Sequence, residues 1–159
     1  MKQKELAKWL KIIIFFCWIF GLLFCVYVAP ETGKNILLDS YPLNELYKPF
    51  IAFIWITGLP YFYALCIGWR ICSDINIGND FTVKNARRLK RVSVLAMTEG
   101  VLYLIALLYV FISGHYNTNL LMVLLLILFF AVVISVFTSL LSYLMGKASK
   151  IKQDNELTI

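Results

Sequence analysis

Charged side chains are scarce in this sequence. Lys, Arg, Asp and Glu make up 15% of the 159 residues, hydrophobic residues make up 61%, and the mean hydropathy is +0.80. Soluble domains contain about 25% charged and about 45–50% apolar residues. The shortage of charge therefore argues against an ordinary soluble domain and is typical of a membrane protein. The length suits a small helical bundle, because one span needs about 20 residues.

Catalytic and metal-binding groups are equally few. The chain has a single histidine, His115, and no Cys-x-x-C pair, whereas zinc and haem sites need more ligands than this. A serine nucleophile would need a base at the same depth, and the apolar runs supply none. The four cysteines lie within or just beside apolar runs, where a thiol behaves as a small hydrophobic group: Cys17, Cys25, Cys66 and Cys72. We therefore expect a protein that is not an enzyme and that carries no metal or cofactor.

Four long apolar runs dominate what is present. They predict an all-α, integral membrane four-helix bundle that forms one domain over residues 1–159, with spans at about 12–29, 50–69, 92–112 and 120–146. Pro30 follows the first run, and we expect residues 30–48 to form an interfacial loop rich in Tyr and Leu. Pro60 predicts a kink in the second span, because proline removes a backbone donor.

The basic residues are distributed unevenly between the two sides of these spans. The N-terminal segment, the junction at residues 70–91 and the C-terminal tail hold 4, 6 and 3 Lys plus Arg, whereas the two other loops hold 2 and 0. Basic residues collect on the cytoplasmic side of membrane proteins. Both termini and the junction are therefore predicted to lie in the cytoplasm.

Glu99 is the only formally charged residue well within a span. A carboxylate at the centre of a span costs on the order of 2.5–3.5 kcal/mol. We therefore expect Glu99 to face the bundle and to find a hydrogen-bond donor or take up a proton. Residue counts from the cytoplasmic ends place Tyr63 and Ser139 at the same depth, with Ser135 and Ser142 nearby on one stripe of the fourth span.

These five residues form a predicted polar layer with two interpretations. It is either a cytoplasm-facing site for a small polar or cationic ligand or a proton, or a set of hydrogen bonds that holds the helices together. We favour the second, because the spans contain no second acid and no lysine. Three small residues that allow close helix packing point the same way: Ser93, Ala96 and Gly100.

The segment before the third span is the most polar part of the chain interior. Asp80 or Thr82 is suited to cap a helix, and no proline interrupts the chain from Thr82 to Ile112. We predict one helix over this range, about 46 Å long, that extends into the cytoplasm. Its first turns should present a basic face of Lys84, Arg87, Arg88 and Arg91, and another face leading into the bundle, of Asn85, Leu89, Val92, Ala96 and Glu99.

The basic face has three interpretations. It binds anionic lipid headgroups, at about 1 kcal/mol per charge, it only sets the topology, or it binds a protein. Direct contact with nucleic acid is not expected, because basic residues so close to a membrane leave a duplex little room. The candidates for partner or lipid contact are Asp80, Phe81, Asn85, Arg87, Arg88 and Arg91.

The same segment resembles a family of bacterial four-helix membrane proteins classed as a domain of unknown function. Members carry a Gly-x-x-Phe-(Ser/Thr)-x-x-Asn-x-x-Arg-Leu motif before the third span, here at Gly78, Phe81, Thr82, Asn85, Arg88 and Leu89. Some members are encoded beside very small helix-turn-helix regulators. The resemblance implies a location in the bacterial cytoplasmic membrane and a role as membrane partner of a cytoplasmic repressor.

The leading hypothesis is thus a non-enzymatic, multi-pass membrane protein that acts by protein interaction, as a regulatory or immunity-type factor. The alternative is a small transporter or ligand-binding protein that uses the layer around Glu99. The expected partners are membrane lipids and a cytoplasmic protein, and the sequence is compatible with a homo-oligomer.

Overall fold

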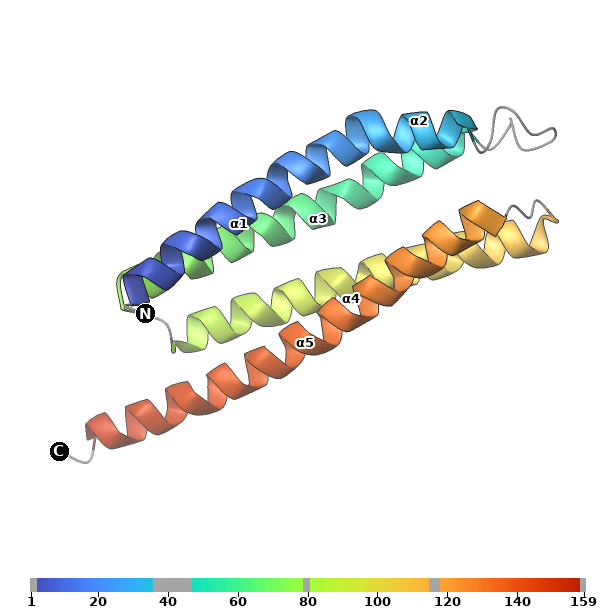
Figure 1. The fold of residues 1–159 in the computed structure, drawn as a ribbon. Coiled ribbons are helices and arrows are strands. Elements are labelled where there is room, and N and C mark those ends of the chain that lie inside the picture. The colour runs from blue at the N-terminus through green and yellow to red at the C-terminus, as the bar shows by residue number, and fades with distance from the viewer. Residues whose placement is uncertain (1–2, 36–46, 79–80, 115–117, 158–159) are drawn as a thin grey trace.

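The computed structural model describes residues 3–35, 47–78, 81–114 and 118–157. Regular structure in these ranges is helical throughout (Figure 1): α1 (Gln3–Leu23), a π-helical turn η1 (Phe24–Val28), α2 (Ala29–Gly33), α3 (Tyr47–Asn76), α4 (Val83–Ile112) and α5 (Thr118–Leu157). Four helical rods, the first composed of α1, η1 and α2, are long and apolar enough to cross a membrane. The prediction of an all-α membrane protein with four spans is confirmed.

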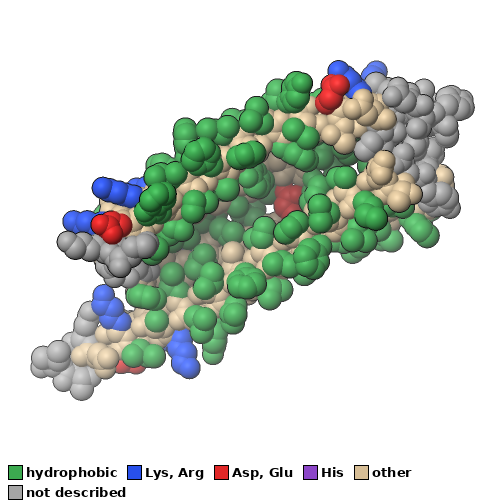
Figure 2. Space-filling model, in the orientation of Figure 1, with side chains coloured by type: hydrophobic (Ala, Val, Ile, Leu, Met, Phe, Trp, Pro, Cys, Tyr) green, Lys and Arg blue, Asp and Glu red, His purple; other side chains and the backbone are tan. Residues whose placement is uncertain are grey.

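The rods form two antiparallel pairs. α1 lies along α3, α4 lies along α5, and α3 contacts α4 (Figure 1). Both termini and the α3–α4 connection lie at one end of the molecule, and the α4–α5 turn lies at the other (Figure 1). Hydrophobic side chains dominate the face of both pairs that Figure 2 shows, and many large hydrophobic residues are exposed, as expected where the surrounding solvent is lipid.

The first rod continues beyond the predicted end of its span. Pro30 lies in the first turn of α2, and the helix runs on to Gly33. The preceding π-helical turn makes this possible, because the Ala29 N–H donates to the carbonyl of Phe24, five residues back. A single wider turn of this kind accommodates a local misfit without ending the helix. The loop expected over 30–48 therefore begins later, and its middle, residues 36–46, lies outside the described residues.

Helices also fill most of the junction predicted at residues 70–91. α3 extends to Asn76, and α4 begins at Val83 after the N-cap Thr82. The long third helix is confirmed, with the predicted capping residue. α5 extends to Leu157, so most of the predicted C-terminal tail is helical.

A hydrophobic cluster holds the two pairs together toward the end with the α4–α5 turn. It contains Tyr103 and Val110 of α4 and Leu120 and Leu124 of α5. Phe53 of α3 packs edge-on against Tyr103, with 5.1 Å between the ring centroids. The Tyr103 and Thr57 hydroxyls are hydrogen-bonded at 3.2 Å, which joins α4 to α3.

Two glycines at helix interfaces differ in the space around them, so we expect their substitution by alanine to affect stability unequally. A Cβ at Gly21 of α1 would lie 2.5 Å from Tyr61 Cε1, whereas a Cβ at Gly100 of α4 would lie 3.7 Å from Ala131 Cβ. We expect Gly21→Ala to lower the free energy of unfolding by about 1–3 kcal/mol through overpacking. The shifted Tyr61 ring would also lose its hydrogen bond to the Cys17 carbonyl.

Gly100→Ala is the matched control, because both substitutions raise helix propensity equally. Unfolding of the purified protein in detergent, titrated with dodecyl sulfate, measures both. Equal stability of the two variants would contradict the close α1–α3 approach at Gly21.

Candidate functional site

The α3–α4 connection is built by residues of the sequence motif. Gly78 has a backbone φ of +83°, a left-handed conformation that glycine adopts without steric cost, and its N–H donates to the Ile75 carbonyl at the end of α3. Thr82 has extended backbone angles, and its hydroxyl accepts a hydrogen bond from the Asn85 N–H at 3.2 Å. The chain therefore leaves α3 and enters α4 through a defined turn and a capped helix start.

A polar cluster behind this turn joins the two helices. Arg88 Nη1 donates to Asp74 Oδ2 at 2.6 Å and to Asn85 Oδ1 at 2.8 Å. Asn85 is 0% exposed, and the side chains of Arg88 and Asp74 are 16% and 26% exposed. A charge-assisted bond in such shielded surroundings is stronger than a surface ion pair. We call Asp74, Asn85 and Arg88 the junction cluster.

The junction cluster corrects the predicted basic face. Arg88 turns inward to α3, and Asn85 is buried, so neither is available as a surface contact for a partner. Arg87, Arg91 and Phe81 are exposed, and Asp80 lies outside the described residues. Sequence reasoning missed Asp74, although an acid fourteen residues before Arg88, across a predicted turn, was a usable signal.

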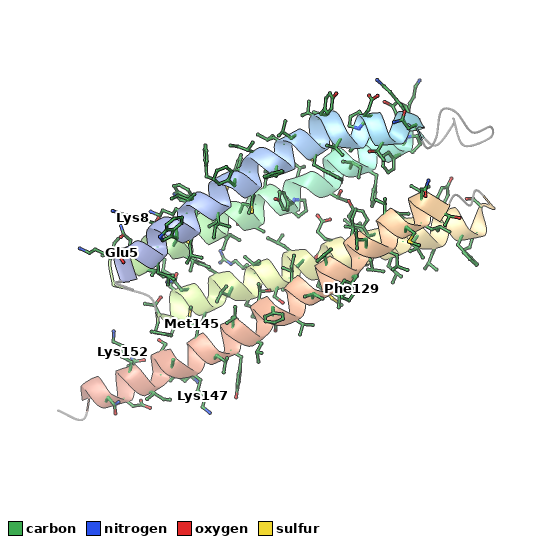
Figure 3. The ribbon with its side chains drawn as sticks, in the orientation of Figure 1. Glu5, Lys8, Phe129, Met145, Lys147 and Lys152 are labelled. Carbon is green, nitrogen blue, oxygen red and sulfur yellow. The ribbon has the colours of Figure 1, made fainter. Side chains whose placement is uncertain are left out.

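Further lysines surround this end of the molecule. Lys84 and Lys90 of α4 are exposed, as are Lys147, Lys150 and Lys152 of α5. Figure 3 shows Lys147 and Lys152 on α5, at the same end as Glu5 and Lys8 of α1. The exposed cations of α4 and α5 and the N-terminal part of α1 thus form one basic end.

The predicted polar layer does not assemble around Glu99. Ser135 Oγ donates to the Ser93 carbonyl at 3.0 Å, and Ser93 Oγ donates to the Ser135 carbonyl at 2.8 Å. Ser142 Oγ donates to the Ala86 carbonyl at 2.7 Å. These bonds tie α4 to α5, which is the structural use of membrane serines that we favoured.

Two other members of the layer are exposed. Tyr63 is 52% exposed and Ser139 is also exposed. The expectation that Tyr63, Ser139 and Glu99 form one internal layer is therefore not met. Equal depth in the membrane does not fix the rotation of a helix about its own axis, and that rotation decides which side chains meet.

Glu99 lies on a different face of α4 from the one that packs against α5. It lies roughly 100° around the helix from Gly100, the residue against Ala131 of α5, and one turn from Tyr103, which contacts α3. Glu99 Oε1 is buried and has no hydrogen-bond partner among the described residues. The molecule is hollowed between its two helix pairs, and acidic atoms are visible inside the hollow (Figure 2).

A buried carboxylate oxygen without a partner is costly in hydrocarbon. A donor group of a ligand or a water molecule would supply the missing hydrogen bond, and a proton would remove the charge. In the part of the chain that the structure describes, no three His, Cys, Asp or Glu side chains gather closely enough to hold a metal ion.

Comparisons with known proteins place the chain among membrane proteins without an assigned role. A family model described as "Protein of unknown function (DUF2975)" matches residues 3–159. The chain is 26% identical over 142 residues to the "Uncharacterized membrane protein YoaS" of Bacillus subtilis (strain 168), a match that covers 87% of this chain and 88% of that protein. No solved structure matches significantly.

The junction cluster predicts the effect of removing one charge. Asp74→Asn leaves the Arg88 guanidinium half-buried without its counter-charge, and we expect a loss of about 1–3 kcal/mol in the free energy of unfolding. Arg88→Gln/Asp74→Asn should recover part of this loss, because no uncompensated charge is left. Arg87→Gln, the exposed neighbour, should change little. Equal stability of Asp74→Asn and Arg87→Gln in a detergent unfolding titration would contradict the cluster's role.

Proposed function

Since the chain belongs to the family of proteins of unknown function DUF2975, we propose that it is a non-enzymatic, multi-pass protein of the bacterial cytoplasmic membrane that acts by binding a cytoplasmic protein. Both termini and the α3–α4 connection lie on the cytoplasmic side in this proposal. The support is the charge distribution, because the segments at this end hold 4, 6 and 3 basic residues against 2 and 0 at the other.

One observation carries the proposal of a docking role. Arg87 and Arg91 are exposed on the first turns of α4, and the back of the same turns is fixed by the Arg88–Asp74 pair at 2.6 Å and the Ser142–Ala86 bond at 2.7 Å. A basic surface held rigid on its inner side loses little conformational entropy when it binds. A purely topological role for these charges needs no such rigid base.

The chemistry of this surface suggests an acidic partner. Lys84, Arg87 and Arg91 offer cations without an acid among them on these turns, and complementary charge accelerates association. The resemblance noted above implies a very small helix-turn-helix regulator as the partner. Binding at the membrane would hold such a regulator away from DNA and so control its activity.

Charge reversal tests the docking role. We expect Arg87→Glu/Arg91→Glu to abolish retention of a small cytoplasmic helix-turn-helix protein when the tagged chain is purified from native membranes in mild detergent. Lys34→Glu/Lys48→Glu, a double reversal of exposed lysines at the opposite end, should retain it. Mass spectrometry identifies the retained protein.

A reporter fused to the C-terminus checks that the topology is unchanged in both variants. The proposal is wrong if no cytoplasmic protein is retained by the native chain. It is equally wrong if the α4 reversal alters only topology.

The unpartnered Glu99 oxygen supports a second candidate function. In this alternative the protein binds or transports a small cation or proton in the hollow between the helix pairs, with Glu99 as the counter-charge. The buried Oε1 without a partner is the specific observation, because a carboxylate within a membrane span costs free energy. The absence of Tyr63 and Ser139 from the surroundings of Glu99 limits the polar contacts that such a ligand would find.

Substitution of Glu99 tests this alternative. We expect Glu99→Gln to lose saturable binding of the lipophilic cation tetraphenylphosphonium, measured by equilibrium dialysis of the detergent-solubilised protein. Glu31→Gln, which changes an exposed acid paired with Lys34, should bind as the native chain does. Glu99→Gln should also unfold no earlier than the native chain, since it removes only an unsatisfied charge. Unchanged binding in Glu99→Gln would exclude the alternative.

A further inference from the structure

An open groove runs between α1 and α3 toward the basic end. It is lined by Phe15 and Trp18 of α1 and by Cys66, Trp69 and Arg70 of α3. The Trp18 wall is held in place by Phe62, with ring centroids 5.1 Å apart.

Two cations from different helices lie beside this groove, Arg70 in its lining and Lys11 over the Trp69 ring. Lys11 of α1 reaches across to α3, where its ammonium lies 5.3 Å from the centre of the Trp69 ring. Arg70 follows Trp69 directly in the chain and forms no ion pair among the residues that the structure describes. Asp74, one turn further along α3, is already bonded to Arg88. The rim therefore carries positive charge without a neutralising acid in its lining.

The polarity of the groove changes along its length. On α1 the residues at positions 4, 8, 11, 15 and 18 share one side of the helix, and they are three lysines followed by Phe15 and Trp18. Trp18 lies about 10 Å deeper than Lys11 at 1.5 Å per residue. On α3 the order is the same, with Arg70 at the rim and Cys66 about one turn deeper. A cationic rim thus leads into an aromatic, apolar floor.

We propose that this groove is a defined binding site for one anionic phospholipid. The phosphate diester pairs with Arg70 and Lys11 at the rim, and the first part of an acyl chain packs on Phe15 and Trp18. Charge complementarity selects this occupant, because the quaternary ammonium of a zwitterionic lipid would be repelled by the two cations and a soluble phosphate ester leaves the aromatic floor uncovered. Basic pockets between helix ends on the cytoplasmic side suit such headgroups.

Quenching of tryptophan fluorescence tests the site. The full chain is reconstituted in nanodiscs of phosphatidylcholine that contain increasing fractions of phosphatidylglycerol, with brominated acyl chains on one lipid at a time. Bromine quenches only tryptophans in contact with its chain. We expect brominated phosphatidylglycerol to associate about thirtyfold more strongly than brominated phosphatidylcholine, the ratio given by roughly 1 kcal/mol of headgroup attraction for each of the two cations.

Tryptophan variants assign the signal. Trp18→Phe, which changes the tryptophan beneath the acyl chain, should remove most of the selective quenching, whereas Trp55→Phe, which changes an exposed tryptophan outside the groove lining, should leave it. Equal quenching by both lipids in the native chain would overturn the proposal. Selective quenching that survives Trp69→Phe and Trp18→Phe together would also overturn it.

Charge variants test the rim. Lys11→Gln/Arg70→Gln should reduce the selectivity to about one, because each charge contributes to headgroup attraction. The exchange Lys11→Arg/Arg70→Lys should retain it, which shows that the fold tolerates changes at these positions. Arg87→Gln/Arg91→Gln, which neutralises two exposed cations of α4, should also retain it. Loss of selectivity in the α4 variant, or its persistence in the groove variant, would contradict the site.

A soluble competitor separates the two sources of phosphate. Glycerol 3-phosphate at millimolar concentration should not diminish the selective quenching. Full displacement by it would show that the groove binds soluble phosphate esters, which overturns the lipid proposal.

Discussion

The pairing of Arg88 with Asp74 is the constraint on which the basic end of the structure depends. Each helix pair has its own internal contacts, but at this end α3 and α4 are joined by a guanidinium that bonds Asp74 at 2.6 Å and Asn85 at 2.8 Å. A half-buried guanidinium is stable only when its donors are matched by acceptors. The turn at Gly78 and the cap at Thr82 bring those acceptors within reach, so turn, cap and pair act together.

Lipid as the solvent explains the remaining interactions. In hydrocarbon no hydrophobic force drives helices together, so close packing and interhelical hydrogen bonds take its place. The α4–α5 pair uses both, in the reciprocal Ser93–Ser135 bonds and in the approach of Gly100 to Ala131. The α3–α4 contact uses the Thr57–Tyr103 bond at one end and the junction cluster at the other. Glu99 lies between these two contacts along α4.

The parts of the structure that follow from local sequence were predictable, and the parts that depend on helix rotation were not. The lengths of the apolar runs predict the spans, and the capping residue Thr82 predicts the start of α4. The first helical rod continues through Pro30 because of a π-helical turn, which no local sequence pattern predicts. Residue depth placed Tyr63 and Ser139 in one internal layer with Glu99, yet both are exposed. Arg88 turns inward because it pairs with Asp74, a residue that the sequence pattern had assigned to the junction between two spans.

The structural roles of the motif residues indicate which other residues are candidates for function. Gly78 makes the turn, Thr82 caps α4, and Asn85 and Arg88 belong to the junction cluster. These four positions are accounted for by folding alone, because each satisfies a backbone or side-chain group of the α3–α4 connection. A match to the motif therefore indicates the same connection and does not by itself identify a partner. Function must be sought in residues that the fold does not use, which are the exposed Arg87 and Arg91, the unpartnered Glu99, and the cations at the rim of the α1–α3 groove.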